Sequence, residues 1–171
     1  MIRKATLDDI ASIMRIVKQA QYRLHSAGVA QWQDGYPSIP IFENDIAGGN
    51  CYVAEEDGKI VGFAVIILDV EPTYAVIEGG EWLTSGRDYC VIHRIAVDDD
   101  YLKSGLGKRF FEYAEKLSLE NGVEVMRIDT HKDNIPMQHL IAKMGYTYCG
   151  VITLTTGALR NAYEKILRQP L

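Results

Sequence analysis

The sequence is short of cysteine and of long apolar runs, and each absence excludes a class of protein. Its three cysteines, Cys51, Cys90 and Cys149, are odd in number and stand far apart. Isolated thiols build neither a disulfide framework nor a CxxC metal site, so we expect small core residues and no metal. No window approaches the roughly eighteen uninterrupted apolar residues of a membrane-spanning helix, so we expect no membrane partner.

The sequence is also short of positive charge. Its 18 Lys and Arg residues face 23 Asp and Glu residues, which gives a formal net charge of −5 at pH 7. This balance opposes general attraction to nucleic acid or anionic lipid, so an anionic ligand must be held by a local site. The start, Met1-Ile2-Arg3-Lys4, is not followed by an apolar run of signal type, so we expect a cytoplasmic location.

What is present is one continuous alternation of strand and helix patterns, without a repeat or a linker. A chain of 171 residues with 47% apolar and 24% charged residues fits one domain, 1–171. Periodicity predicts strands over 1–5, 51–55, 59–69, 89–97, 123–130, 146–154 and 161–167, and 74–82 as an extension of the second and third. It predicts helices after Thr6 and over 39–47, 104–121 and 134–145. The order βααβββαβαββ indicates an α/β domain with a central sheet of about seven strands.

Local signals mark several of these boundaries. Thr6, with Asp9 three positions on, forms a capping-box arrangement before an apolar helical stripe. Asn134, followed by Pro136, is typical of a helix cap with proline in the first turn. Gly145 ends that helix, and the turn 155–157 is expected to join the last two strands in a hairpin.

The stretch from Val91 to Arg109 carries the strongest functional signal. An apolar strand runs through an acidic turn into a helix start that contains Gly105 and Gly107. Such a junction gathers backbone N–H groups and the positive end of a helix dipole, where a pyrophosphate can bind. Glycine lets a ligand approach the backbone closely, and the neighbouring Lys103, Lys108 and Arg109 can add charge. The alternative is that the glycines only form a tight helix start, with the basic groups solvated.

Two other phosphate motifs do not fit this stretch. A Walker-type loop needs glycine where Leu102 stands and Ser or Thr where Arg109 stands. A dinucleotide fingerprint needs a third glycine where Phe110 stands. The glycines therefore belong to a different kind of phosphate loop, or to none.

Two motifs resemble those of the GCN5-related N-acetyltransferase (GNAT) superfamily. The first is Leu102-Lys103-Ser104-Gly105-Leu106-Gly107, which follows a strand ending in Ile95-Ala96-Val97 and matches the family pattern Arg/Gln-x-x-Gly-x-Gly/Ala except at Leu102. The second is Asn134 followed by a short amphipathic helix that ends in Gly145-Tyr146. With the element order, the resemblance covers nearly the whole chain.

This resemblance implies the GNAT fold, with a mixed, mostly antiparallel sheet, and an acetyl-CoA donor held between the strands 89–97 and 123–130. It implies that the cofactor is bound by Ile95, Ala96, Val97, Leu102, Lys103, Ser104, Gly105, Leu106, Gly107, Lys108 and Asn134. The strand residues would hold the pantetheine and the acetyl carbonyl, the turn amides the pyrophosphate, and Asn134 the pantetheine or sulfur end. The implied activity is transfer of acetyl to a primary amine by direct attack on the thioester.

Candidate catalytic residues follow from the same resemblance. His93 is the leading general base, because it lies two residues before Ile95, where family members often place a glutamate, and imidazole titrates near neutrality. A structural histidine is the alternative. Glu78 and Glu81 are rival bases, or else solvated loop carboxylates. The position where many members carry a tyrosine acid is Ile141, so Tyr146 is the candidate acid, with Tyr148 and His139 as substitutes.

The acceptor is less well defined by the sequence. Trp32, Tyr36 and Trp82 lie in irregular segments that cover the acceptor side in this family, and aromatic walls suit a cationic amine. Asp129 and His131 either line that site or stabilise a turn. We expect a small-molecule or peptide amine, with homodimerisation through sheet edges as an added prediction. A non-catalytic acyl-CoA-binding or sensor module is the main alternative, and a purely structural interaction domain is a third.

Overall fold

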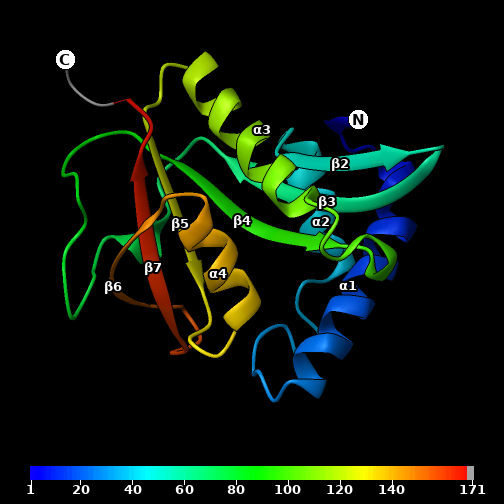
Figure 1. Cartoon of the computed structure of the whole chain (residues 1–171), viewed down its shortest axis with the longest axis horizontal. Helices are drawn as coiled ribbons and strands as arrows, with labels where there is room; N and C mark the ends of the chain where they lie inside the picture. Colours follow the sequence, from blue (N-terminus) through cyan, green and yellow to red (C-terminus); the bar gives the residue numbers. More distant parts are fainter. Residues whose placement is uncertain (169–171) are drawn as a thin grey trace. The chain divides into compact units, whose positions relative to one another are not determined.

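The computed structural model describes residues 1–168 (Figure 1). Its regular elements are β1 (Ile2–Lys4), α1 (Ile10–Ser26), α2 (Ile39–Ala47), β2 (Cys51–Glu56), β3 (Lys59–Ile67), β4 (Cys90–Val97), α3 (Leu106–Glu120), β5 (Val125–Thr130), α4 (Ile135–Lys143), β6 (Thr147–Thr153) and β7 (Leu159–Ile166). Short 3-10 turns occupy Leu7–Asp9 (η1), Pro72–Tyr74 (η2) and Asp99–Tyr101 (η3). The predicted order βααβββαβαββ is confirmed. The last three residues of the predicted domain, 169–171, lie outside the described residues.

The strands form one mixed sheet flanked by helices, in the order β1-β2-β3-β4-β5-β7-β6. The pairs β1/β2, β2/β3, β5/β7 and β6/β7 are antiparallel, and β4/β5 is parallel. The prediction of a mixed, mostly antiparallel sheet of seven strands is therefore confirmed. The β6–β7 hairpin closes through the predicted turn, where the Gly157 N–H donates to the Leu154 carbonyl at 2.9 Å.

The chain falls into two compact units, and it passes between them three times, at the end of β3, inside β4 and inside α3. The first unit comprises residues 1–66 and 94–110, and the second comprises 67–93 and the chain from 111 onward. The prediction of a single domain, like those of a homodimer and a cytoplasmic location, stays a prediction. No helix among residues 1–168 is long and apolar enough to cross a membrane.

In the first unit, α1 turns a buried stripe of Ile13, Ile16 and Val17 inward. Phe42 of α2 packs edge to face on Phe63 of β3, with ring centroids 5.1 Å apart. The predicted capping box is present at the start of the α1 region, where the Thr6 N–H donates to the Asp9 carboxylate at 2.8 Å. The sequence pattern thus set the N-terminal boundary of this region correctly, although its first turn is a 3-10 turn.

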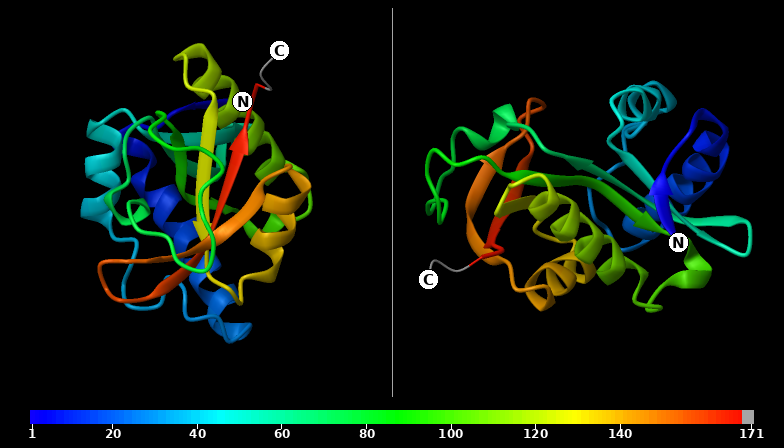
Figure 2. Two further views of the ribbon diagram at one scale, coloured as in Figure 1. Left: turned by 90° about the vertical axis from the view of Figure 1, so that its left-hand side faces the viewer. Right: turned by 90° about the horizontal axis from the view of Figure 1, so that it is seen from above.

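In the second unit, the long loop between β3 and β4 lies against β6 and β7 (Figure 2). Its core is formed by Tyr74, Tyr89, Val91, Val125, Ile152 and Ala162. The loop was predicted to continue the meander over 74–82, and this was wrong, because the described chain has no strand there and the loop meets β6 at an isolated bridge, Glu78 to Val151. Gly80 explains the close approach, since a Cβ there would lie 2.1 Å from the Cys149 carbonyl oxygen.

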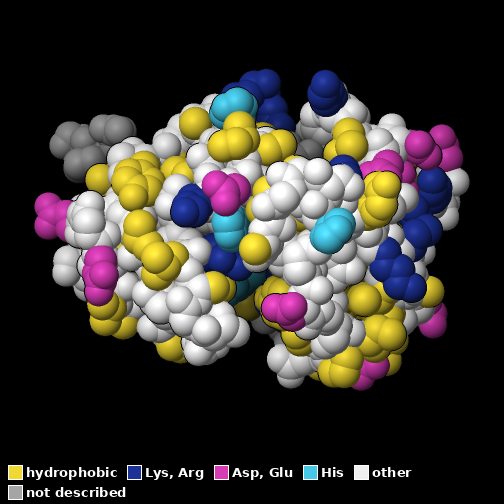
Figure 3. Space-filling view, turned by 90° about the horizontal axis from the view of Figure 1, so that it is seen from below, with side chains coloured by type: hydrophobic (Ala, Val, Ile, Leu, Met, Phe, Trp, Pro, Cys, Tyr) yellow, Lys and Arg dark blue, Asp and Glu magenta, His cyan; other side chains and the backbone are white. Residues whose placement is uncertain are grey.

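The structure shows where the cysteines and the charged side chains lie. The three cysteines are free and buried, which confirms them as core residues. One face of the molecule carries both acidic and basic side chains between scattered apolar ones (Figure 3). Among residues 1–168, no group of three His, Cys, Asp or Glu side chains gathers as a metal site would need.

Candidate active site

The acidic turn after β4 is a structural anchor within the first unit. Asp98 is 1% exposed, its carboxylate accepts the Asp100 N–H at 2.9 Å, and it pairs with Arg15 and, at 3.7 Å, with Lys59. Burial alone would raise the pKa of Asp98, but Arg15 and the Asp100 N–H hold it below its usual value. These contacts tie the end of β4 to α1 and β3, so the chain that follows starts from a fixed point.

The glycine turn, residues 102–107, follows that anchor. Lys103 and Gly105 both have left-handed backbone, with φ of 61° and 85°. Neither amide N–H donates to an acceptor among residues 1–168. A Cβ on Gly105 would meet no atom within 4 Å, so the space beside it is open. The turn therefore presents unpaired N–H donors to an open surface, which is the arrangement that binds anions.

The helix start behind the glycine turn is held by close packing. Leu106 is 2% exposed, and its N–H donates to the Ser104 hydroxyl at 3.3 Å. A Cβ on Gly62 of β3 would lie 2.9 Å from Phe110 and 3.1 Å from Leu106, so only glycine lets α3 begin this close to β3. Of the predicted basic neighbours, Arg109 is engaged with Glu56 at 2.9 Å. Lys103 and Lys108 are exposed, as is Leu102.

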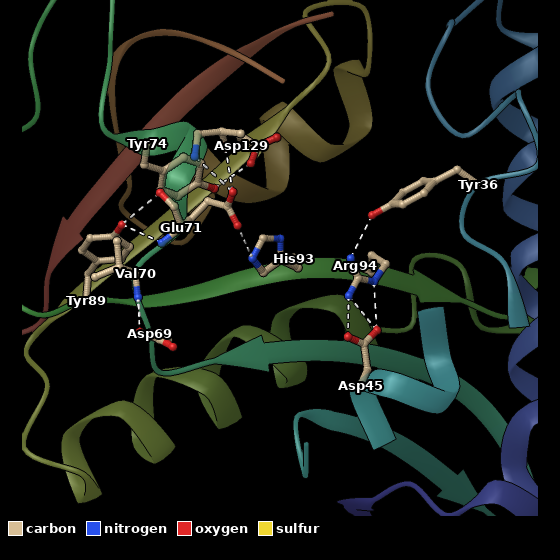
Figure 4. Close-up of polar contacts among 11 residues, drawn as sticks. Tyr36, Asp45, Asp69, Val70, Glu71, Tyr74, Tyr89, His93, Arg94 and Asp129 are labelled. Atoms are coloured by element: carbon tan, nitrogen blue, oxygen red, sulfur yellow. Dashed lines mark hydrogen bonds and ion pairs between the residues drawn. The ribbon is translucent and has the colours of Figure 1, made fainter. Parts of the chain in front are cut away.

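The His93 cluster, which comprises Glu71, Tyr74, Tyr89, His93 and Asp129, lies in the second unit (Figure 4). His93 Nε2 lies 3.2 Å from Glu71 Oε2, with both side chains about one-fifth exposed, at 19% and 21%. The other Glu71 oxygen accepts the Thr73 N–H at 3.2 Å and the Thr73 hydroxyl at 2.9 Å. The hydrogen bond with His93, against the opposing effect of burial, lowers the pKa of Glu71 to about 2. Glu71 is therefore an anion at neutral pH.

A second hydrogen-bonded pair completes the cluster. The hydroxyl of Tyr74, which is 2% exposed, donates to Asp129 Oδ2 at 2.6 Å. Burial raises the pKa of Tyr74 well above its usual value, so the phenol stays protonated. Burial also raises the pKa of Asp129, although Tyr74, His93 and Arg160 act in the opposite direction. Two carboxyl groups with opposite pKa shifts thus lie beside one imidazole.

His93 lies beyond the last residue of β4 that pairs with β5. The parallel register joins Cys90 to Met126 and Val91 to Arg127. His93 follows two residues later on β4, and Asp129 two residues later on β5. The cluster therefore lies just beyond the paired residues of β4 and β5, where side-chain contacts follow the backbone pairing.

Comparison with known proteins agrees with this geometry. The family model described as Acetyltransferase (GNAT) family matches residues 12–146, which is most of the chain. The chain belongs to the GNAT family. A solved GNAT-family acetyltransferase from Streptococcus agalactiae is 34% identical and superposes with a TM-score of 0.89, over 99% of this chain and 96% of that one.

Two more distant matches were also found. The streptothricin acetyltransferase of Escherichia coli is 25% identical over 134 residues, which are 78% of this chain and 66% of that protein, just under two thirds of its length. The PaiA N-acetyltransferase of Thermoplasma acidophilum, solved in complex with coenzyme A, shares the fold at 16% identity, with a TM-score of 0.72 over 97% of this chain and 98% of that one. Family membership and the coenzyme complex support acetyl-CoA as the donor.

The other predicted catalytic residues of the GNAT chain lie apart from these contacts. Glu78 and Glu81 are exposed in the loop before β4, and no contact among residues 1–168 joins either to His93. Tyr146 is 7% exposed, its hydroxyl donates to Glu115 at 3.1 Å, and burial raises its pKa. Its surroundings favour a packing role. Ile141, where many members carry the acid, is fully buried.

The three predicted acceptor aromatics are each engaged inside their own unit. Trp32 stacks on Phe63 at 6.4 Å between ring centroids. The Tyr36 hydroxyl accepts from Arg94 at 2.8 Å, and Arg94 in turn pairs with Asp45 at 2.6 Å. The Trp82 Nε1–H donates to the Tyr74 carbonyl at 3.0 Å. Tyr36 nevertheless stays 41% exposed, so a role of these aromatics on the acceptor side stays a prediction.

Asn134 and His131, near the end of β5, both make local contacts. The Asn134 Oδ1 accepts the Met137 N–H at 3.3 Å, so it caps α4 as predicted. His131 Nδ1 accepts the Asp133 N–H at 3.0 Å, and burial lowers its pKa. The His131 contact agrees with the predicted turn-stabilising alternative, whereas Asp129, for which the same alternative was predicted, accepts the Tyr74 hydroxyl.

Sequence reasoning missed Glu71, Tyr74 and Tyr89 as members of the His93 cluster. Glu71 and Tyr74 lie 22 and 19 positions before His93 in the loop between β3 and β4, where the predicted strand 74–82 was wrong, and Tyr89 was predicted only as the first residue of the strand 89–97. The only signal was local: Glu71-Pro72-Thr73 has an acidic side chain directly before a proline turn, and Glu71 caps that turn through Thr73.

Proposed function

We propose that this GNAT member is an acetyl-CoA-dependent N-acetyltransferase that acetylates a primary amine of a small molecule or peptide, with His93 as the general base. One observation carries the proposal: a partly buried imidazole held at 3.2 Å by a carboxylate that is ionised at neutral pH. An alkylamine has a pKa near ~10 and arrives mostly protonated, so a base must take its proton.

The contact with Glu71 determines which nitrogen of His93 can act. Glu71 Oε2 lies 3.2 Å from His93 Nε2, so in this proposal the Nε2 proton points to the carboxylate and the lone pair lies on Nδ1. Nδ1 then takes the amine proton, directly or through water. The imidazolium that forms is stabilised by the adjacent carboxylate, by the same logic as a catalytic triad.

Of the predicted donor-binding residues, those from Ile95 to Lys108 lie in the first unit and Asn134 lies in the second. Bound acetyl-CoA supplies an acetyl thioester, whose carbonyl carbon bonds to the amine nitrogen while the carbon–sulfur bond breaks and the thiolate leaves. In this proposal the N–H groups of Lys103 and Gly105 hold the diphosphate, with the rest of the predicted set from Leu102 to Lys108 around them. The backbone of Ile95, Ala96 and Val97 and the side chain of Asn134 hold the pantetheine. The unpaired amides and the open space beside Gly105 support this fit.

A non-catalytic acyl-CoA-binding module is the second candidate, and one observation favours it. The usual acid position is a buried isoleucine, Ile141, and the hydroxyl of Tyr146 is bonded to Glu115. Loss of the acid weakens the enzyme reading only partly, because a thiolate with a pKa of ~8.5 leaves without much help. The second candidate therefore differs from the first in turnover rather than in binding.

Two measurements on the purified protein separate these candidates. Release of free thiol from acetyl-CoA is followed with a panel of small amines, peptide amino termini and lysine peptides, and coenzyme A binding is measured by calorimetry. Binding with amine-dependent thiol release is the expected result. Binding without turnover for any acceptor would favour the sensor module, and no binding at all would refute both.

A further inference from the structure

Tyr89 connects the proposed catalytic pair to a buried part of the second unit. The Glu71 N–H donates to the Tyr89 hydroxyl at 2.9 Å, and the same hydroxyl lies 3.4 Å from the Glu71 carbonyl oxygen. Tyr89 is 8% exposed, so these contacts are shielded from bulk water. One hydroxyl therefore engages both polar groups of the Glu71 backbone, while the carboxylate of Glu71 engages His93 (Figure 4).

The ring of Tyr89 is itself held by a buried cation. The Arg127 guanidinium lies 4.2 Å from the Tyr89 ring centroid and 4.1 Å from that of Trp82. Its Nε donates to the carboxylate of Glu164 at 2.5 Å, and both side chains are nearly inaccessible, at 7% and 0% exposed. Glu164 also accepts the N–H and the hydroxyl of Thr84, at 2.8 Å and 3.0 Å. A buried ion pair with these bonds satisfied is costly to disrupt, so the ring has a rigid support.

We infer that Tyr89 is a positioning residue for the proposed transfer, because its hydroxyl holds Glu71 where the carboxylate meets His93 Nε2. The inference rests on the proposed function for its kinetic consequence only. Removal of the hydroxyl leaves the Glu71 N–H without its partner in a partly buried segment. The segment then relaxes, and the carboxylate loses its fixed distance from the imidazole.

The charged and titratable neighbours of His93 make this inference specific. Glu71 contacts the ring directly. Asp129 is the second acidic group beside it; its carboxylate accepts the Tyr74 hydroxyl, and the charge of Arg160 lowers its pKa against the effect of burial. The Tyr89 hydroxyl contacts Glu71 but has no contact with Asp129 among residues 1–168. A change in the titration of His93 after loss of this hydroxyl therefore reports on Glu71.

The test is Tyr89→Phe, which keeps the ring and its stack on Arg127. We expect kcat to fall by about 5-fold to 20-fold while the KM for acetyl-CoA changes less than about 2-fold. The acidic limb of the pH–rate profile should move to lower pH, because a displaced carboxylate favours the protonated imidazole less. Tyr22→Phe is the control, since Tyr22 is 74% exposed on α1. Tyr22→Phe should leave kcat and the pH–rate profile unchanged.

A second measurement needs no substrate, so it tests the role of Tyr89 independently of the proposed function. Nitrogen-15 NMR of the histidine rings, assigned with His93→Gln, follows the pH at which the His93 signals change. A shift to lower pH in Tyr89→Phe supports positioning even if the wild type proves inactive as a transferase. An unchanged titration overturns the inference, including when kcat falls, because the hydroxyl would then serve stability alone.

The wild type supplies a check if Tyr89→Phe does not fold. The Glu71 amide is held by the buried Tyr89 hydroxyl, whereas the neighbouring Val70 amide donates to the exposed Asp69 carboxylate at 2.7 Å. Hydrogen exchange at Glu71 should therefore be at least about 10-fold slower than at Val70. Equal exchange rates would show that Tyr89 does not hold Glu71.

Discussion

The glycine turn offers backbone groups to a ligand, whereas the His93 cluster offers side chains. The turn offers backbone N–H groups on an exposed loop, and its shape depends on left-handed dihedrals at Lys103 and Gly105. The cluster offers side-chain atoms on buried and partly buried residues, held by a hydrogen bond of 2.6 Å between Tyr74 and Asp129 and an ion-pair contact of 3.2 Å between His93 and Glu71. The contrast indicates that the turn tolerates changes of side chain that keep its backbone. The cluster, by comparison, should respond to the loss of single atoms.

The largest effect should come from His93→Gln, which breaks the cluster at its centre. Loss of a general base costs about 10²-fold to 10⁴-fold in rate, so kcat should fall in that range and the acidic limb of the pH profile should disappear. Coenzyme A affinity, which we assign to the turn, should stay within about 2-fold. His25→Gln is the control, because His25 is exposed at the end of α1. An unaltered pH profile would remove His93 from the mechanism.

Glu71→Gln should have the next largest effect, because it keeps the shape of the cluster and removes one charge. The pKa of Glu71 is lowered to about 2, so this carboxylate stays ionised from neutral pH down to strongly acidic solution. Without that charge the imidazolium is less favoured, and the acidic limb of the profile should move to lower pH. We expect kcat to fall about 10-fold to 100-fold. A limb that moves to higher pH would contradict the assigned contact.

Gly105→Ala tests the glycine turn, and Gly122→Ala is the matched control. Both glycines have left-handed φ, 85° and 75°, and a Cβ at either position meets nothing within 4 Å. Each alanine should therefore lower the free energy of unfolding by about 1 kcal/mol, in chemical denaturation. Only Gly105→Ala should weaken coenzyme A binding, by about 10-fold in calorimetry, since its methyl group occupies the path of the ligand. Equal affinity in both variants would refute the diphosphate site at the turn.

The two regions also differ in how far the sequence could predict them. The glycine turn lies within six residues, and its conformation follows from local rules about glycine, helix starts and caps, so Gly105 and the Asn134 cap could be predicted directly. The cluster joins residues 71, 74, 93 and 129, which only the fold brings together. His93 could be proposed because it lies near a position where family members often carry a catalytic glutamate. Nothing in the family pattern points to its partner, Glu71.

The same reason explains why Trp82 was assigned a different environment. Aromatic residues in a loop suggest a cation-binding wall, and the sequence cannot tell whether the cation comes from a ligand or from the chain. In the structure the cation beside Trp82 is Arg127, which sits on the buried Glu164. Tyr146 illustrates the converse, because a tyrosine next to a functional motif packs on Phe111 with ring centroids 5.6 Å apart.

Leu102→Arg should produce the smallest effect, and it asks whether side-chain charge matters at the turn at all. Leu102 is 47% exposed and stands where the family pattern has Arg or Gln. Exposed ion pairs contribute about 0.2–1 kcal/mol, so coenzyme A should bind about 1.4-fold to 5-fold tighter at low salt. Salt should remove the gain, because exposed charges are screened. Leu102→Met is the uncharged control, with unchanged affinity expected. If the arginine gives no gain at low salt, the turn holds its anion through backbone N–H groups alone, and the contrast with the His93 cluster becomes complete.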